Sequence, residues 1–197
     1  LDVSVAEGVL SLTSLYIDEH LATGAVPGPG HDVLTGRYAF YDTYECADGG
    51  WVSVGAIEPH FYRNLCQALD CTQWVEHQYD DTVQDAVRRD FSAAFRKRDR
   101  DAWVADLAPN DTCVAPVYGI DELVEDPHLR ERGAFSEASD PEDGTFRQVA
   151  PVLAGMPRPQ VPVAVRDADQ TDTQALLAEA GLEPDAIERL RADGIIS

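Results

Sequence analysis

The middle of this chain is predicted to form a β-hairpin, because side chains alternate on both sides of Asp48-Gly49-Gly50. After the tripeptide, residues 51–54 (Trp-Val-Ser-Val) form a short run in which valines alternate with other residues. Aspartate followed by glycine supplies the backbone freedom that a tight turn needs. Before the turn, four side chains would share one face of a strand: Tyr38, Phe40, Asp42 and Tyr44.

Amphipathic helices follow the predicted hairpin. Pro59 stands where a first helical turn would begin, ahead of an amphipathic segment at residues 61–69. Residues 82–98 carry apolar side chains at helical spacing, and a short helix is predicted at residues 102–107. With a further strand predicted at residues 112–117, residues 38–112 are expected to form a small α+β domain.

The flanking segments are organised differently. Residues 3–21 carry an apolar helical face, and residues 24–30, rich in glycine and proline, are predicted to be a linker. Because the chain starts at Leu1 inside this helical pattern, we expect that an upstream segment is missing. Residues 151–162 contain four prolines and are expected to run extended over a surface. Two closing helices are predicted at residues 173–180 and 184–192, separated by Gly181.

The charge balance restricts the partners of the chain. Its 197 residues include 36 Asp and Glu but 15 Lys and Arg, for a formal net charge of −21 at pH 7. Phosphate backbones and anionic membrane surfaces both require positive patches, so neither nucleic acid nor a membrane is expected as a partner. Lys97 is the single lysine beside fourteen arginines, a composition that favours adaptation to high salt, with an ordinary acidic protein as the alternative.

The cysteine and histidine patterns predict no metal centre. Cys46, Cys66, Cys71 and Cys113 match neither zinc-knuckle spacing nor a dense disulfide framework, so free thiols are expected. The five histidines are scattered, and neither a phosphate-binding glycine loop nor a Gly-x-Ser-x-Gly elbow is present. No apolar run reaches the length of a membrane span and no secretory signal is visible, so a cytoplasmic protein is expected.

Glu58 stands at the junction between the end of a predicted strand and the helix that Pro59 opens. One interpretation is structural, because a carboxylate near a helix N-terminus stabilises the helix dipole by about 0.3–1 kcal/mol. The other is functional, because ligands are often met by side chains in such connecting segments. Position alone favours the structural interpretation.

The segments around this junction also resemble a known family. Residues 41–50 (YDTYECADGG) and residues 54–62 (VGAIEPHFY) resemble the central signature of alpha-methylacyl-CoA racemases, which are members of the family III CoA-transferases. The resemblance covers nearly all of this chain but about the C-terminal half of the family's length. It continues through residues 111–117, 126–128, 132–135 and 177–182.

The resemblance implies an α/β fold with three parts. In the family, the N-terminal half builds most of a large CoA-binding domain with a Rossmann-like sheet, which the C-terminal tail completes. By analogy, residues 1–37 belong to the large domain, residues 38–112 form the small domain, and residues 113–197 return to dock on the large domain. Two protomers interlock and each active site lies between their domains, so the expected partners are a second copy and the missing N-terminal half.

The resemblance also implies exchange of configuration at the 2-methyl carbon of an acyl-CoA. One group removes the α-hydrogen and another returns a proton to the opposite face, with no cofactor besides the CoA thioester substrate. The family's acid/base His and Asp would lie upstream of Leu1, and Glu58 matches the glutamate that hydrogen-bonds this His. Ile57, Tyr41 and Leu34 match positions facing the acyl chain, with core packing as the competing interpretation of each.

Other functions stay open at this level. A family III CoA-transferase would use an upstream Asp as nucleophile, although residues 56–59 (AIEP) carry a carboxylate where transferases generally have a glycine-rich loop. The chain departs from the racemase pattern at residues 36–41 and 170–173, which affects the substrate loop and the docking of the tail. The chain could also be a noncatalytic module or one subunit of a split enzyme. Because the racemase chemistry needs groups that the resemblance places upstream of Leu1, the isolated chain is expected to be inactive.

Overall fold

A computed structural model of the chain describes residues 4–151, 155–156, 158–166 and 171–196. The chain divides into two compact units, Leu1–Tyr118 (unit 1) and Gly119–Ser197 (unit 2), which are described separately. The predicted helix start at residue 3 and part of the predicted extended segment at residues 151–162 lie outside the described residues.

The predicted hairpin is confirmed in unit 1. Strand β1 (Tyr41–Glu45) pairs with the antiparallel strand β2 (Trp51–Gly55), and Gly49 adopts a positive φ of 79° in the turn. The strand predicted at residues 112–117 is also present, over a shorter range, as β3 (Val114–Val117), which pairs antiparallel with β2. The three strands form one sheet with the order β1-β2-β3.

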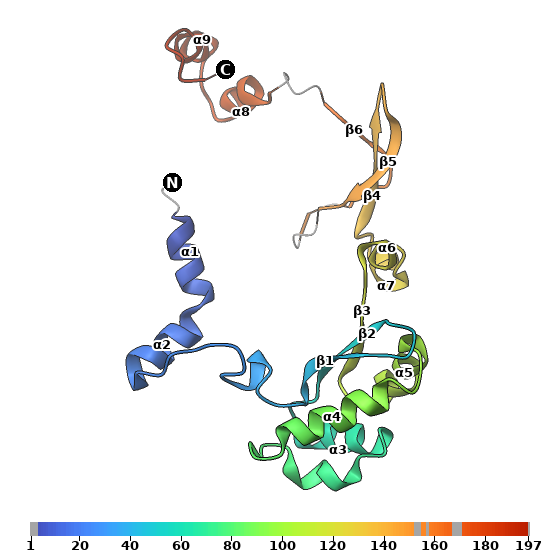
Figure 1. Cartoon of the computed structure of the whole chain (residues 1–197). Helices are drawn as coiled ribbons and strands as arrows, with labels where there is room; N and C mark the ends of the chain where they lie inside the picture. The colour runs from blue at the N-terminus through green and yellow to red at the C-terminus, as the bar shows by residue number, and fades with distance from the viewer. Residues whose placement is uncertain (1–3, 152–154, 157, 167–170, 197) are drawn as a thin grey trace. The chain divides into compact units, whose positions relative to one another are not determined.

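Three of the predicted helices are confirmed in unit 1: α3 (Pro59–Ala68), α4 (Gln84–Phe95) and α5 (Arg100–Leu107). Figure 1 shows α3 and α4 on one side of the β1–β2 pair. Tyr44 of β1 stacks on Phe95 of α4 with ring centroids 5.1 Å apart, and it meets Phe91 edge-on at 6.0 Å. The largest fully buried apolar side chains of this core are Phe40, Tyr44, Val52, Tyr62, Leu65, Val87, Phe91, Phe95 and Leu107.

The polar connection between α3 and α4 is tied into this core. It contains the short 3-10 helix η2 (Thr72–His77), which the sequence pattern does not predict. The buried Gln84 accepts a hydrogen bond from the backbone N–H of Ala39 at 3.0 Å. The same side chain donates to the carbonyls of His77, Gln78 and Asp80 within the connection. One buried side-chain amide therefore provides hydrogen-bond partners for several backbone groups that burial would otherwise leave without any.

The N-terminal helical segment of unit 1 is broken, so the prediction of one continuous helix is wrong. Helix α1 (Val5–Leu12) and helix α2 (Ser14–Thr23) are separated at Thr13, which has φ −103° and ψ 10°. The Thr13 hydroxyl donates to the carbonyl of Val9 at 2.9 Å, a local bond that competes with regular helix geometry. The apolar side chains of α1 are exposed.

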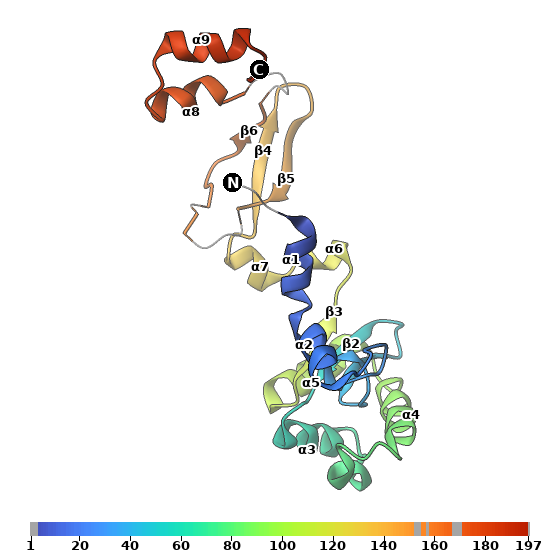
Figure 2. The same ribbon diagram turned by 90° about the vertical axis from the view of Figure 1, so that its left-hand side faces the viewer.

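Unit 2 begins with two short helices, α6 (Ile120–Leu123) and α7 (Pro127–Glu131), followed by a small sheet. Strands β4 (Phe135–Asp140) and β5 (Gly144–Val149) form a hairpin, and β6 (Val163–Ala164) lies parallel to β4, as Figure 2 shows. The sequence pattern does not predict this hairpin. The face that β4 buries carries Ser136 and Ala138, which give no apolar alternation.

The two closing helices are confirmed as α8 (Thr173–Glu179) and α9 (Pro184–Ala192), with Gly181 at φ 88° between them. No helix within the described residues combines the length and apolar character needed to cross a membrane. The fold is thus a mixed α/β arrangement with small sheets. Completion of a Rossmann-like sheet, an interlocked dimer and the division at residues 37 and 112 stay predictions.

Candidate functional site

An open pocket of about 610 Å³ lies on the sheet of unit 1. Three short segments line it: residues 34–36 of the turn before β1, residues 41–43 of β1 and residues 53–55 of β2. Cys113, immediately before β3, completes the lining. Two of the predicted substrate-binding residues, Leu34 and Tyr41, therefore meet in one pocket.

The pairing of β1 with β2 explains where the pocket forms. Tyr41 is opposite Gly55, and Thr43 is opposite Ser53. Successive side chains of a strand point to opposite faces, so these four residues share the face turned away from Tyr44, which packs on α4. A Cβ atom added to Gly55 would lie 3.9 Å from the Tyr41 ring, so the missing side chain leaves space beside that ring.

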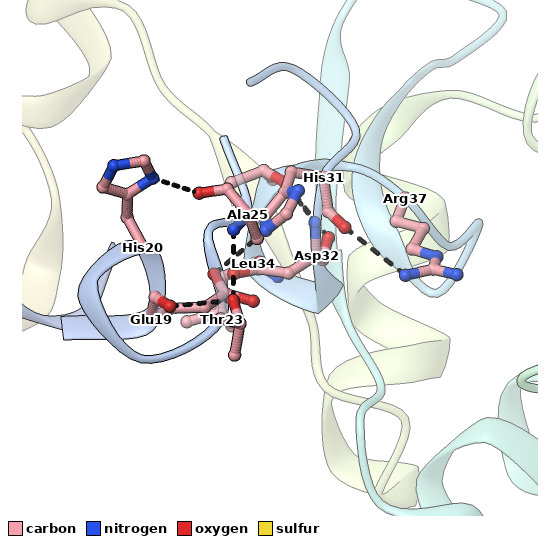
Figure 3. A network of polar contacts seen from close by, with 9 residues as sticks. Glu19, His20, Thr23, Ala25, His31, Asp32, Leu34 and Arg37 are labelled. Atoms are coloured by element: carbon pink, nitrogen blue, oxygen red, sulfur yellow. Dashed lines mark hydrogen bonds and ion pairs between the residues drawn. The ribbon is translucent and has the colours of Figure 1, made fainter. Parts of the chain in front are cut away.

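The turn that carries Leu34 is built from local hydrogen bonds. In the 3-10 helix η1 (Val33–Thr35), the Asp32 carboxylate accepts from the Leu34 N–H at 2.8 Å, and the Thr35 hydroxyl accepts from the Asp32 N–H at 2.9 Å. Figure 3 shows this network continuing to α2, where His31 Nε2 lies 2.9 Å from a Glu19 carboxylate oxygen. The Leu34 side chain is half exposed beside the pocket.

Ile57 and Glu58 follow the pocket strand but do not line the pocket. Ile57 is half-buried against the core, and its carbonyl accepts hydrogen bonds from Gln78 at 2.7 Å and from the Tyr79 hydroxyl at 3.1 Å. Glu58 is the exposed N-cap residue of α3, but its side chain makes no capping hydrogen bond. Within the described residues, no hydrogen bond or ion pair engages the Glu58 carboxylate.

Cys113 connects Glu58 with the pocket. Burial raises the pKa of the Cys113 thiol, and the negative charges of Glu58 and Asp111 raise it further. The charge of Glu58 therefore acts on a residue of the pocket lining. Cys113 is exposed and has a positive φ of 52°, whereas Cys46, Cys66 and Cys71 are buried. All four are free thiols, as predicted.

Several lining residues are missing from the sequence prediction. Ser53, Gly55 and Cys113 become neighbours through strand pairing, and Gly36 joins them from the end of η1; no local motif reveals this arrangement. The alternation of β2 is the signal that could identify Ser53 and Gly55 as one face. In the parts of the chain that the structure describes, no three His, Cys, Asp or Glu side chains gather as metal ligands would. The roles predicted for Glu58, Ile57, Tyr41 and Leu34 stay predictions.

Comparison with known proteins identifies the family of this chain. Residues 1–166 match CoA-transferase family III. The chain belongs to this family. It is 32% identical over its whole length to alpha-methylacyl-CoA racemases from Mus musculus and Homo sapiens, of which it covers 51%. This family III chain therefore spans about half the length of the curated relatives it matches.

Solved structures show the same fold at lower sequence identity. A CAIB/BAIF family protein from Brucella suis is 16% identical with a TM-score of 0.60, and the match covers 86% of this chain and 44% of that protein. The crystal structure of Rv3272 from M. tuberculosis is 18% identical with a TM-score of 0.59, covering 77% of this chain and 40% of that protein. These likenesses support the family III fold of the chain.

Proposed function

We propose that this chain is the C-terminal half of an enzyme that racemises 2-methylacyl-CoA thioesters by α-proton exchange. The observation that carries the proposal is the 32% identity over the whole chain to two alpha-methylacyl-CoA racemases. The pocket supports it, because an apolar leucine and an aromatic ring line its surface, and the charge of the unpartnered Glu58 carboxylate acts on Cys113 in the same lining. A 2-methylacyl group needs such a mixed environment, with its chain on apolar atoms and its reacting carbon near polar groups.

In the proposed enzyme, Leu34 and Tyr41 contact the acyl chain, and Ile57, which does not line this pocket, would meet the acyl chain beyond it. Gly55 keeps the space beside the Tyr41 ring open, and its substitution by a larger side chain should block it. We expect Gly55→Val to weaken binding of 2-methylacyl-CoA without unfolding unit 1, because the site at Gly55 needs no positive φ.

Glu58 is proposed as the residue that orients a catalytic histidine supplied by the N-terminal half. Its carboxylate has no partner within the described residues, so it is free to accept a hydrogen bond from outside them. A carboxylate beside an imidazole fixes the tautomer and stabilises the protonated ring during proton transfer. The hydrogen bonds from Gln78 and Tyr79 to the Ile57 carbonyl hold the backbone that presents this carboxylate. This chemistry uses no cofactor apart from the CoA thioester itself.

The proposal is tested by mixing this chain with a separately produced N-terminal half. A 2-methylacyl-CoA of one configuration in deuterated water should acquire deuterium at the α-carbon and lose optical purity, whereas the 197-residue chain alone should show neither change. Glu58→Gln should lower kcat in the mixture. Glu76→Gln is the matched control, because Glu76 is also exposed and its replacement removes the same charge. A mixture that assembles but exchanges no α-hydrogen would contradict racemisation.

CoA transfer is the second candidate. It is favoured by a likeness to the succinyl-CoA–D-citramalate CoA-transferase of Chloroflexus aurantiacus, which is 24% identical over 79% of this chain. Adding a free carboxylate acceptor to the same mixture distinguishes the two reactions. A new thioester formed without α-deuteration would indicate transfer. Size-exclusion chromatography with light scattering of the mixture tests the proposed homodimer.

A further inference from the structure

We propose that Arg88 is a positioning residue that holds the two walls of the pocket at a fixed separation. The guanidinium extends from α4, which packs on the sheet face opposite the pocket, and it is not itself part of the pocket lining. Its Nε donates to a carboxylate oxygen of Asp42 in β1 at 2.8 Å, and its Nη2 donates to the carbonyl of Gly36 at 2.8 Å. Asp42 and Gly36 both line the pocket, one in the strand wall and the other in the wall formed by residues 34–36.

The hydrogen bond from Arg88 to the Gly36 carbonyl links the turn at residues 34–36 to the rest of unit 1. Among the hydrogen bonds of the described residues, those made by residues 34–36 otherwise stay within residues 30–37. Arg88 therefore provides the hydrogen bond that attaches the Leu34 wall to the sheet and α4. The nearby pair between Arg37 and Asp81 is more exposed and joins a residue outside the pocket lining. Arg88 thus adds a hydrogen-bonded link between the Leu34 wall and the sheet to the packing of Val33 on the core.

The chemistry of arginine suits this role. A guanidinium is planar and donates in several fixed directions, so two acceptors at different angles can be held at once. The Arg88 and Asp42 side chains are 30% and 31% exposed, so the ion pair is stronger than a fully solvated one. A second carboxylate, Asp85, is 3.7 Å from the guanidinium and 92% exposed, so it competes weakly.

Two substitutions separate positioning from general stability. Arg88→Lys keeps the positive charge opposite Asp42, but one ammonium cannot reproduce the two-direction geometry. Arg96 provides the matched control. It also joins α4 to β1, through a 2.8 Å bond to Glu45, but neither residue lines the pocket. Arg96→Lys should therefore affect the packing of α4 in a similar way and leave the pocket walls unchanged.

The first measurement uses the 197-residue chain itself. Cys113 is the exposed thiol and lines the pocket, whereas the other three cysteines are buried. We expect Arg88→Lys to raise the rate of Cys113 modification by a maleimide and the rate of amide hydrogen exchange at residues 34–37. Both rates should rise by roughly 2- to 10-fold, because the loss of one hydrogen bond makes local opening of the pocket wall more frequent by about that factor. Arg96→Lys should change neither rate. Equal rates in Arg88→Lys, Arg96→Lys and the unsubstituted chain would overturn the proposal.

The second measurement rests on the proposed function and uses the mixture with the N-terminal half. A loosened Leu34 wall should raise KM for 2-methylacyl-CoA by a similar factor with a smaller change in kcat, whereas Glu58→Gln should act mainly on kcat. If the unsubstituted mixture shows no exchange, the proposed function fails while the thiol and amide measurements still decide the role of Arg88. A change in kcat alone for Arg88→Lys would contradict positioning of the acyl chain.

Discussion

The two units of the chain differ in how much apolar surface they bury. Unit 1 contains nearly all of the buried apolar side chains, including an aromatic cluster in which Tyr44, Phe91 and Phe95 are in contact. The buried apolar residues described in unit 2 are Ala138, Ala150 and Ile187. Because burial of apolar surface is the main force in folding, unit 1 has its own source of stability. Unit 2 has secondary structure with little core beneath it.

Charge increases this contrast. Unit 1 has 19 acidic and 8 basic residues, a net charge of −11 over 118 residues, and unit 2 has 17 acidic and 7 basic residues, a net charge of −10 over 79 residues. Unit 2 thus carries the higher density of negative charge and the smaller core. Self-repulsion destabilises a compact state, so unit 2 should be the first to open.

The largest expected effect comes from removing the same side chain in each unit. Phe91 is fully buried in unit 1, whereas Phe146 on β5 of unit 2 is 43% exposed. Phe91→Ala should lower the free energy of unfolding by about 3–5 kcal/mol, because it removes apolar contacts and leaves a cavity. Phe146→Ala should lower it by much less. Chemical denaturation monitored by tryptophan fluorescence follows unit 1, since all three tryptophans lie there, and circular dichroism follows both units.

These two substitutions test whether unit 2 has less of a stabilising core than unit 1. If Phe146→Ala destabilises the chain as much as Phe91→Ala does, unit 2 contributes a core that its exposed side chains do not reveal. Amide hydrogen exchange gives an independent check, because the amides of β2 and α4 should be better protected than those of β4 and β5.

The same contrast explains which parts of the fold could be predicted from sequence. Helix α4 was predictable because Val87, Phe91 and Phe95 repeat at helical spacing and are all buried. The β4–β5 hairpin was not, because β5 is exposed throughout and the buried face of β4 contains small side chains. Hydrophobic periodicity records burial, so a segment that buries little leaves little trace in the sequence.

The site was predictable in part for a related reason. Leu34, Tyr41, Ile57 and Glu58 were selected through a family resemblance, and the structure brings Leu34 and Tyr41 into one pocket. Arg88 and Cys113 were not selected, because their positions depend on the packing of α4 on β1 and the pairing of β3 with β2. These contacts join residues far apart in the chain, and no local motif encodes them.

The second prediction concerns salt and the unequal charge density. Transfer from 1 M to 0.01 M sodium chloride lengthens the Debye length from about 3 Å to about 30 Å, so repulsion within each unit is no longer screened. The thermal midpoint should fall by several degrees, and amides of β4 and β5 should lose protection before those of β1 and β2. The experiment uses chloride and not sulfate, because sulfate is excluded from the protein surface and stabilises compact states whatever the charge of the protein. A midpoint independent of salt would exclude adaptation to high salt.

The third prediction concerns alkaline pH, which should destabilise unit 1 in particular. Burial raises the pKa of Cys46 to about 11 and that of Cys66 to about 12. An unfolded thiol loses its proton near pH 8.5, so between there and the folded pKa the unfolded state binds fewer protons than the folded state. The free energy of unfolding should therefore fall as pH rises above about 9, by at most about 1.4 kcal/mol per pH unit for each thiol.

Cys66→Ala separates this effect from ordinary loss of packing. The variant should be less stable at neutral pH but should show a shallower decline between about pH 9 and pH 11, because one of the titrating thiols is absent. Unit 2 contains no cysteine, so its amide protection should respond less to the same change in pH. An equal decline in both units would show that general charge repulsion dominates.

The smallest expected effect concerns the pocket face of unit 1 and the charge of Glu58. The pKa of Cys113 is raised first by burial and then by Glu58. Glu58→Gln removes that second contribution, so the pKa of Cys113 should fall and its thiolate fraction at pH 8 should rise. Maleimide modification should then accelerate by less than about tenfold, the factor that a full pKa unit would give.

Glu76→Gln, measured at the same salt concentration, should leave the rate unchanged, because Glu76 does not contribute to the Cys113 pKa. An unchanged rate in Glu58→Gln would show that this carboxylate does not act on the pocket, and would remove the structural support for its proposed role beside a catalytic histidine.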